Sequence, residues 1–493
     1  MDRFIASALC AALLAAATSS AMAGPASAHH GRGARGVFWF THLSDTHIGA
    51  SDIVYPDSSD HFELALEQIV PVIDPAFVVV TGDLCNGSAM NIPTSGPSQA
   101  EWDTYARIVG HASMTDDFYF DVPGNHDGYG DVGLGHYLEN SVQGRANGVP
   151  FFDWVVTTPV SEHYFFGLSS AGEGSQPLIE APEFTEPAIE ALEAGLLAHG
   201  DADTTFVFAH HPLHVPERSA QVAGLLRDHG GAYYLHGHRH EYTEYADASR
   251  GIVSNEVDTL GKGDVSNIGV GVIDHGALIY RARNVLSPWP FVVISAPMHR
   301  YLRGTETPHP GAYDVCLDRP DNPFRAVVFA PQAPSRVLVE VGTLIAPSAM
   351  TLVDGTTALW QAELDTRALP PGPHHVTVTA FVGDAQAQHT VTSTFAPGPC
   401  APLPDDDPSA SDVPPGQGSA TWADARGGAA GGDECSDALL GGSGPQGEAP
   451  VGCHAAPQDS SHAPGGRLLP TAVLCLAWAS RRRKASGWPA RRA

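Results

Sequence analysis

Between residues 37 and 283, short apolar runs alternate with stretches of helical periodicity, and this pattern most constrains the fold. Such alternation is typical of a layered α/β domain with much of its sheet parallel, because each helix returns the chain to the start of the next strand. The later runs Ile268–Ile273 and Ala277–Ala282 predict a meander that closes a second sheet. The expected strands are Val37–Leu43, Phe77–Thr81, Phe118–Val122, His163–Leu168, Thr205–Ala209 and Ala232–Leu235, and the expected helices are His61–Val70, Glu101–His111, Phe184–His199 and Ala220–His229.

Beyond Pro288 the helical periodicity disappears, and apolar runs are separated by turns rich in Pro, Gly and Asp. This spacing predicts a small β-sandwich of about 100 residues. We place the α/β domain at residues 36–285 and the β-domain at residues 286–398. The expected strands of the second domain are Phe291–Ser295, Arg325–Phe329, Arg336–Val341, Ala358–Leu364 and His375–Phe381.

The N-terminus has the features of a secretory signal peptide. Arg3 precedes the apolar run Phe4–Ala17, and Ala21-Met22-Ala23 is the small-x-small pattern that signal peptidase reads. We therefore expect residues 1–23 to be removed and the protein to be exported; a buried N-terminal helix is the alternative. Export allows disulfides, and Cys316 and Cys400 flank the strand-rich segment that they can close, although the connectivity stays open.

The composition of the C-terminal fifth of the chain changes twice, near residue 399 and near residue 466. Residues 399–465 form an acidic linker rich in Pro and Gly, which cannot bury enough apolar surface to fold and is expected to be disordered. In residues 466–493 the apolar run Leu468–Ala479 precedes an Arg-rich cluster, but it is short for a span of about 20 residues. Together with Cys453, this end resembles the C-terminal sorting tails of myxobacterial surface proteins, which implies attachment at the cell surface or outer membrane; secretion and an unstructured basic end are the alternatives.

The charge balance limits the partners of the chain. With 26 Lys and Arg against 55 Asp and Glu, the formal net charge is −29. Such an excess argues against binding nucleic acid through bulk electrostatics. Contact with a membrane is expected only through the C-terminal tail, and no protein partner can be assigned to the β-sandwich.

Five polar clusters follow the ends of predicted strands, where an open α/β sheet places its site. Each cluster alone is a weak signal, because a lone His after a strand is more often a structural residue. Their joint occurrence indicates a metal site, since imidazole and carboxylate groups suit Zn, Fe and Mn, and one carboxylate can bridge two ions. The clusters are Asp45-Thr46-His47, Gly82-Asp83, Gly124-Asn125-His126-Asp127, His210-His211-Pro212 and Gly237-His238-Arg239-His240.

This set of motifs resembles the calcineurin-like metallophosphoesterase superfamily over residues 37–283. The resemblance implies a four-layer αββα sandwich and a centre of two divalent metal ions, Mn, Fe or Zn. It also implies which residues bind them. The first metal would be bound by Asp45, His47 and His240, the second by Asn125, His210 and His238, and both by Asp83.

The same resemblance implies a reaction. A hydroxide held between the metals would attack the phosphorus of a phosphate mono- or diester in line. His126 matches the acid that protonates the leaving group, which an imidazole can do near neutral pH. The alternative from another class is a cell-surface binding or adhesion protein whose metallophosphoesterase domain is inactive.

Three positions near the motifs were interpreted separately. Cys85 is expected to be a small buried thiol rather than a ligand. Asn86 is expected to contact the metal-binding residues without binding metal itself. Asp127 occupies a position where many members have Glu, which should alter the hydrogen bonding of the adjacent His.

A narrower likeness is to the transmembrane protein 62-like branch, over residues 37–395. It rests on His42–His47, on Val122–Asp127, and on Trp289-Pro290 leading into a strand. This branch implies that the β-domain is immunoglobulin-like, and it supplies no substrate.

Overall fold

The computed structural model of this chain describes residues 36–49, 59–87, 96–175, 181–262, 266–300, 315–398 and Cys400. All of them belong to the larger of two compact units, residues 1–423; the smaller unit, residues 424–493, lies outside the described residues. The predicted signal peptide and sorting tail, and the predicted linker except for Cys400, also lie outside the described residues.

The first sheet contains five strands in the order β11-β10-β1-β2-β3. Its three motif-bearing strands, β1, β2 and β3, are parallel, as predicted. The hairpin β10–β11 lies antiparallel to β1 in this same sheet, so the prediction that these two strands close a second sheet is wrong. The bounds are β1 Val37–Leu43, β2 Val78–Thr81, β3 Tyr119–Val122, β10 Asn267–Asp274 and β11 Ala277–Asn284.

The second sheet contains six strands in the order β4-β5-β6-β7-β9-β8. Its four inner strands, β5, β6, β7 and β9, are parallel, and both edge strands are antiparallel. The hydropathy pattern of the sequence did not predict β4, β8 or β9. The bounds are β4 Phe151–Thr157, β5 Glu162–Leu168, β6 Thr204–Phe208, β7 Ala232–His236, β8 Thr243–Asp247 and β9 Ile252–Glu256.

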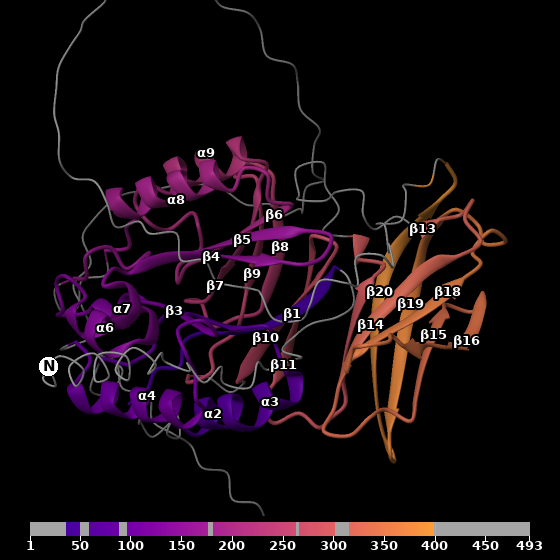
Figure 1. Cartoon of the computed structure of the whole chain (residues 1–493), viewed down its shortest axis with the longest axis horizontal. Coiled ribbons are helices and arrows are strands. Elements are labelled where there is room, and N and C mark those ends of the chain that lie inside the picture. Colours follow the sequence, from indigo (N-terminus) through magenta and orange to yellow (C-terminus); the bar gives the residue numbers. More distant parts are fainter. Residues whose placement is uncertain are drawn as a thin grey trace, which may run out of the picture. The chain divides into compact units, whose positions relative to one another are not determined.

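Helices lie against the outer faces of the two sheets, with α2, α3 and α4 on one side and α8 and α9 on the other (Figure 1). The first predicted helix is split by a π-helical turn, η1. Ser98 begins α4 with a capping box that involves Glu101, which explains why the chain enters this helix there. The bounds are α2 Ser59–Leu64, η1 Ala65–Ile69, α3 Val70–Ile73, α4 Gln99–His111, α5 Asn125–Gly128, α6 Gly135–Asn140, α7 Val142–Asn147, α8 Glu186–Ala198 and α9 Ser219–Asp228.

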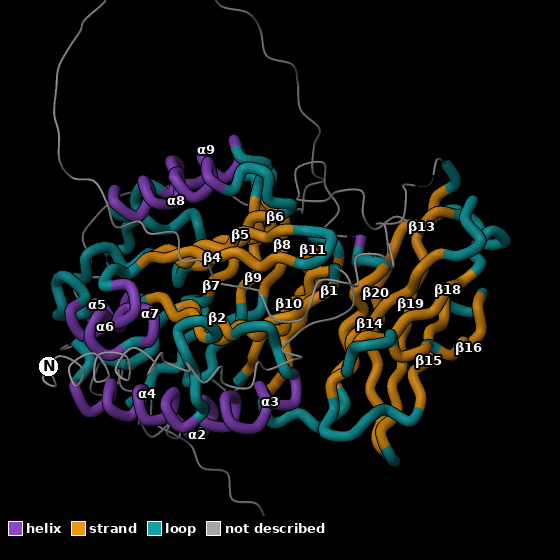
Figure 2. Tube along the Cα trace, in the orientation of Figure 1, coloured by secondary structure: helices purple, strands orange, loops and turns teal. Residues whose placement is uncertain are grey.

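The strands of the two sheets are drawn in orange in Figure 2. A buried cluster rich in aromatic side chains joins the two sheets. Phe77 from the first sheet contacts Phe165 from the second, with 5.0 Å between ring centroids, and stacks on Phe40 at 5.1 Å. Burial of such large apolar rings is the main source of stability in a layered domain. Two further buried clusters pack α2–α4 against the first sheet and α8–α9 against the second. Together, these three buried clusters fix the positions of the strands whose carboxyl ends bear the motifs.

The C-terminal region is built from strands alone among its described residues. Its two sheets, β12-β14-β18-β17 and β13-β20-β19-β15-β16, share one buried apolar cluster. A disulfide joins Cys316 and Cys400, which is the pair that the sequence proposed. The bounds are β12 Phe291–Ala296, β13 Val315–Cys316, β14 Asn322–Phe329, β15 Arg336–Val341, β16 Ile345–Ala349, β17 Thr351–Leu352, β18 Leu359–Leu364, β19 Gly372–Val382 and β20 Ala385–Ala396.

A buried ion pair links the two regions. Arg325 of β14 donates from Nε and Nη2 to the carboxylate of Asp274 in β10, at 2.9 and 2.7 Å. Although burial opposes it, Arg325 holds the pKa of Asp274 well below its usual range. The β-domain therefore contacts the sheet that bears the motifs.

Among the described helices, none has both the length and the apolar character needed to cross a membrane.

Candidate metal centre

The polar clusters come together at one edge of the paired sheets. Asp45 follows β1 and Asp83 follows β2, and backbone bonds keep these two loops side by side: Asp45 N donates to Gly82 O at 3.0 Å, and His47 N to Asp83 O at 2.9 Å. His210 and His238 follow β6 and β7 of the second sheet in the same way. The site therefore lies where the carboxyl ends of strands from both sheets meet.

Asp45, His47 and His240 form a first group. Their ligand atoms all lie within 4.8 Å of one another. His240 Nε2 is 3.0 Å from Asp45 Oδ1 and 3.2 Å from His47 Nε2. Two imidazole nitrogens and a carboxylate oxygen converging in this way form a donor set that suits a divalent transition metal.

Asn125, His210 and His238 form a second group. His210 Nε2 is 2.9 Å from Asn125 Oδ1, and His238 Nδ1 is 3.2 Å from the same oxygen. His210 Nδ1 donates to Thr81 O at 2.7 Å, so Nε2 is the ring atom directed into the group, where it can offer a lone pair once its proton is displaced.

Asp83 lies between the two groups. Its Oδ2 is 3.6 Å from His47 Nε2 in the first, and its Oδ1 is 3.3 Å from His210 Nε2 in the second. Each carboxylate oxygen thus faces a different group, which is the arrangement that a bridging carboxylate needs. The structure brings together all seven residues proposed from the sequence as ligands; their roles as ligands remain a prediction.

The backbone at the site adopts uncommon conformations. Five of the seven positions have positive φ: 53° at Asp45, 45° at His47, 51° at Asp83, 77° at His238 and 57° at His240. A non-glycine residue in the left-handed region costs on the order of 1–3 kcal/mol, and such residues persist where the surrounding structure holds them. These turns take the chain out of the sheet and direct the side chains inward.

Gly124 permits the close approach of two strand-end loops. A Cβ built there would collide with the backbone N and the Oδ1 of Asp83. We expect Gly124→Ala to displace Asp83, to lower bound metal, and to reduce any turnover by at least about 10²-fold, since small misplacements have large kinetic effects. Gly110→Ala is the matched control: nothing lies within 4 Å of its added Cβ, and in helix α4 it should be neutral or stabilising by up to about 1 kcal/mol. Normal metal content in Gly124→Ala would contradict this account.

The electrostatics of the site favour bound cations. Burial acts to raise the pKa of both Asp45 and Asp83, but the neighbouring histidines outweigh it and hold both pKa values well below the usual range. Against the effect of burial, Asp83 and Asp45 raise the pKa of His210 to about 10, so the apoprotein holds a proton there. A divalent cation that binds these groups would displace that proton.

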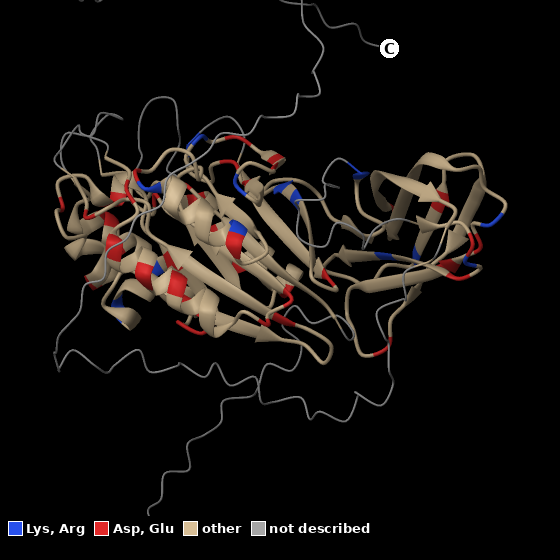
Figure 3. Ribbon diagram, turned by 90° about the horizontal axis from the view of Figure 1, so that it is seen from above, with Lys and Arg blue, Asp and Glu red and all other residues tan. Residues whose placement is uncertain are grey.

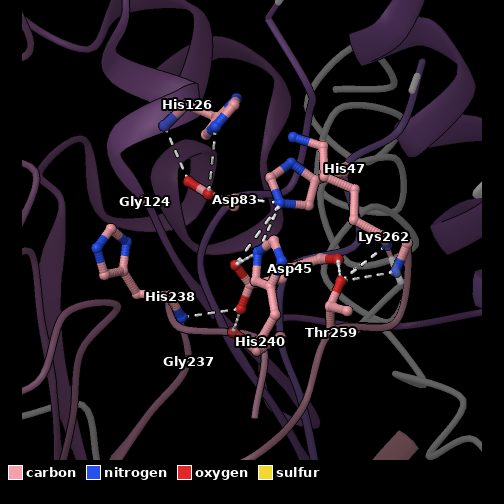
Figure 4. A network of polar contacts seen from close by, with 12 residues as sticks. Asp45, His47, Asp83, Gly124, His126, Gly237, His238, His240, Thr259 and Lys262 are labelled. Atoms are coloured by element: carbon pink, nitrogen blue, oxygen red, sulfur yellow. Dashed lines mark hydrogen bonds and ion pairs between the residues drawn. The ribbon is translucent and has the colours of Figure 1, made fainter. Parts of the chain in front are cut away.

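His126 lies beside the two groups (Figure 4). Its backbone N donates to Asp83 Oδ1 at 2.9 Å, and its ring Nδ1 lies 2.5 Å from Asn86 O. With Nδ1 directed to that carbonyl, Nε2 faces the site, 3.9 Å from Asp83 Oδ2. Burial lowers the pKa of His126 more than Asp83 raises it. The side chain is 15% exposed, so a substrate can reach it.

The neighbouring predictions have mixed outcomes. Cys85 is a buried free thiol, as expected, and burial raises its pKa well above the usual range. Asn86 supports the site because its backbone carbonyl accepts a hydrogen bond from Nδ1 of His126. Asp127 accepts bonds from the backbone N of Gly124, Leu84 and Cys85, at 2.9–3.0 Å. It therefore ties two motif loops together, a role that the sequence analysis missed.

Two other residues near the site were not predicted. His211 joins His210 and His238 in a further group of ligand atoms within 4.8 Å, and its ring Nδ1 lies 2.9 Å from Ser170 Oγ. Lys262 lies next to the first group in a loop after β9 (Figure 4). His211 lies within the cluster His210-His211-Pro212, where only His210 was proposed as a ligand, and no motif marks Lys262.

Comparison with known proteins identifies the fold family of the first region. Residues 38–242 match the family model of calcineurin-like phosphoesterases. The chain thus contains a calcineurin-like metallophosphoesterase domain, as the motifs indicated.

Curated relatives are distant. An Arabidopsis thaliana protein named as a candidate metallophosphoesterase is 25% identical over 226 residues, covering 41% of this chain and 30% of the relative. Transmembrane protein 62 of Mus musculus is 27% identical over 144 residues, covering 28% of this chain and 22% of the relative. The matched segments thus span less than a third of the length of each of these two relatives. Among solved structures, a Streptococcus pneumoniae protein described as a predicted phosphoesterase aligns at 12% identity with a TM-score of 0.21, covering 52% of this chain and 92% of that one.

Proposed function

We propose that this protein is an exported, metal-dependent phosphoric ester hydrolase with two divalent ions in its active site. The observation that carries the proposal is Asp83, whose two carboxylate oxygens face separate His-containing groups. The match to calcineurin-like phosphoesterases supports the same class of reaction. The substrate class is a small phosphate mono- or diester.

The donor set fits divalent metals. Asp45, His47 and His240 would hold one ion, Asn125, His210 and His238 the other, and Asp83 both. Burial lowers the pKa of His47 to about 3 and that of His238 to about 4, so both rings are neutral and have a lone pair available near pH 7. When bound, two such ions polarise the phosphoryl oxygens and lower the pKa of an attacking water.

The protein's own groups complete the mechanism that we propose. The positive-φ turns preorganise the ligands before substrate arrives, so little reorganisation is needed during the reaction. Nδ1 of His126 donates to Asn86 O, which leaves Nε2 facing the departing oxygen. The ring would deliver a proton from Nε2 as the imidazolium, a form that burial opposes and the carboxylate of Asp83 stabilises. The aromatic core beneath the strand ends keeps these distances constant.

The domain layout and location belong to the same proposal. We assign residues 36–285 to a four-layer αββα sandwich and residues 286–398 to an immunoglobulin-like domain; the helices on either side of the paired sheets and the two sheets of the C-terminal region support this. The disulfide Cys316–Cys400 suits an oxidising compartment and so supports export and a place at the cell surface. Acidic side chains are spread over the described ribbon and basic ones occur mostly singly, which supports a small substrate rather than nucleic acid (Figure 3).

The test combines metal analysis with hydrolysis. The full-length protein is purified with Mn, Zn or Fe supplementation, its metal content is measured, and p-nitrophenyl phosphate and bis(p-nitrophenyl) phosphate are assayed. We expect about two ions per chain, with turnover that a chelator removes and added metal restores. Bound metal without turnover on either ester, or absence of metal, would favour the cell-surface binding protein instead.

A further inference from the structure

The loop that follows β9 is attached to the backbone of the first metal-binding motif. Leu260 N donates to Ser44 O at 3.1 Å, and Gly261 N donates to Asp45 O at 2.9 Å. These bonds connect a loop at the end of the second sheet to the turn that carries Asp45. Lys262, the residue after Gly261, is therefore held beside the candidate metal centre.

Thr259 fixes the orientation of this loop. Its hydroxyl donates to Asp45 O at 3.0 Å and accepts from Lys262 N at 2.9 Å. Figure 4 shows the Lys262 side chain extending along the ring of His47, with its terminal nitrogen toward the His126 side. The loop thus directs an ammonium group to the boundary between the first metal-binding group and the proposed acid.

The charge of Lys262 acts on these same residues. Burial is the main cause of the lowered pKa values of His47 and His126, and the Lys262 ammonium lowers both further. The nearby Arg239 is placed differently, because its guanidinium Nε donates to Glu256 Oε2 at 3.0 Å. Its charge is therefore directed to β9, whereas that of Lys262 is directed to the site.

We propose that Lys262 binds a phosphoryl oxygen of the substrate and gives the site a preference for phosphate monoesters over diesters. This inference rests on the proposed function. A phosphate monoester has a second pKa of about 6, so near neutral pH it carries one more negative charge than a diester. An ammonium beside the metal-binding groups stabilises that additional charge, and it stabilises the singly charged diester less.

The test compares wild type with Lys262→Met and Lys262→Arg in the full-length, Mn-loaded protein. For Lys262→Met we expect kcat/KM to fall about 10- to 100-fold on p-nitrophenyl phosphate, and about threefold or less on bis(p-nitrophenyl) phosphate. Lys262→Arg, which keeps the charge, should recover most of the monoester activity. Equal losses on the two esters would overturn the proposal, while turnover by the wild type would leave the hydrolase assignment intact.

A binding measurement makes the inference independent of turnover. Calorimetric titration of the same proteins with inorganic phosphate should show about tenfold weaker binding to Lys262→Met, at unchanged metal content and unchanged circular dichroism. Unchanged phosphate affinity would overturn the role of Lys262 even if the protein hydrolyses neither ester. Should Lys262→Met fold poorly, Lys262→Gln replaces it in both experiments.

Discussion

Asp83→Ala is expected to lose at least one of the two metal ions and to reduce kcat by at least about 10³-fold. The reason is that Asp83 faces both groups, 3.6 Å from His47 Nε2 and 3.3 Å from His210 Nε2, so its loss removes an oxygen from the donor set of each ion. Removal of a buried carboxylate also leaves the histidines around it without their counter-charge. Elemental analysis and hydrolysis of p-nitrophenyl phosphate measure the two effects.

Asp201→Ala is the control for Asp83→Ala, because it removes an exposed carboxylate from the turn between α8 and β6, before the start of β6 rather than at its carboxyl end. It should leave both metal content and rate unchanged. Asp83→Asn separates charge from shape: it keeps the size of the side chain but supplies only one oxygen, so we expect a metal loss close to that of alanine. Two ions per chain in Asp83→Ala would show that the two groups bind metal independently and that Asp83 is not a bridge.

The motif-bearing strands could be predicted because their signal is local. The run Val37–Leu43 is apolar except for Thr41 and His42, is buried throughout, and has the predicted bounds. Edge strands such as Thr243–Asp247 have mixed, half-exposed side chains and therefore no clear pattern. The sheet to which a strand belongs is not a local property either. Residues 267–284 are plainly strand-forming, but nothing in them specifies pairing with β1 rather than with the second sheet.

The candidate ligands could be predicted for a related reason. Each comes directly after a strand, and parallel strands bring their carboxyl ends to one edge. The role of Asp127 and the position of Lys262 could not be predicted in this way, because both depend on backbone contacts between loops distant in sequence. Asp127 is held by Leu84 N and Cys85 N, and Lys262 by Thr259, which is bonded to Asp45. Such contacts leave no spacing or periodicity in the sequence.

His126→Ala is expected to retain both metal ions and to lose rate, in a way that depends on the leaving group. The bond from this residue to Asp83 comes from its backbone N, so alanine can keep it and the metal groups should persist. What alanine removes is the ring whose Nε2 faces the site, and loss of a general acid costs about 10²- to 10⁴-fold. The loss should be largest where the departing oxygen most needs a proton.

The leaving-group series decides whether the ring of His126 acts as an acid. We expect phenyl phosphate, whose leaving group is poor, to lose at least about tenfold more kcat in His126→Ala than p-nitrophenyl phosphate does, because nitrophenolate departs without protonation. His111→Ala, which removes an exposed imidazole from the end of α4, should change neither rate. Equal losses of kcat on both substrates, or a reduced metal content, would contradict the role of an acid. Either result would instead assign His126 a positioning role, since its backbone N contacts Asp83 and its ring contacts Asn86.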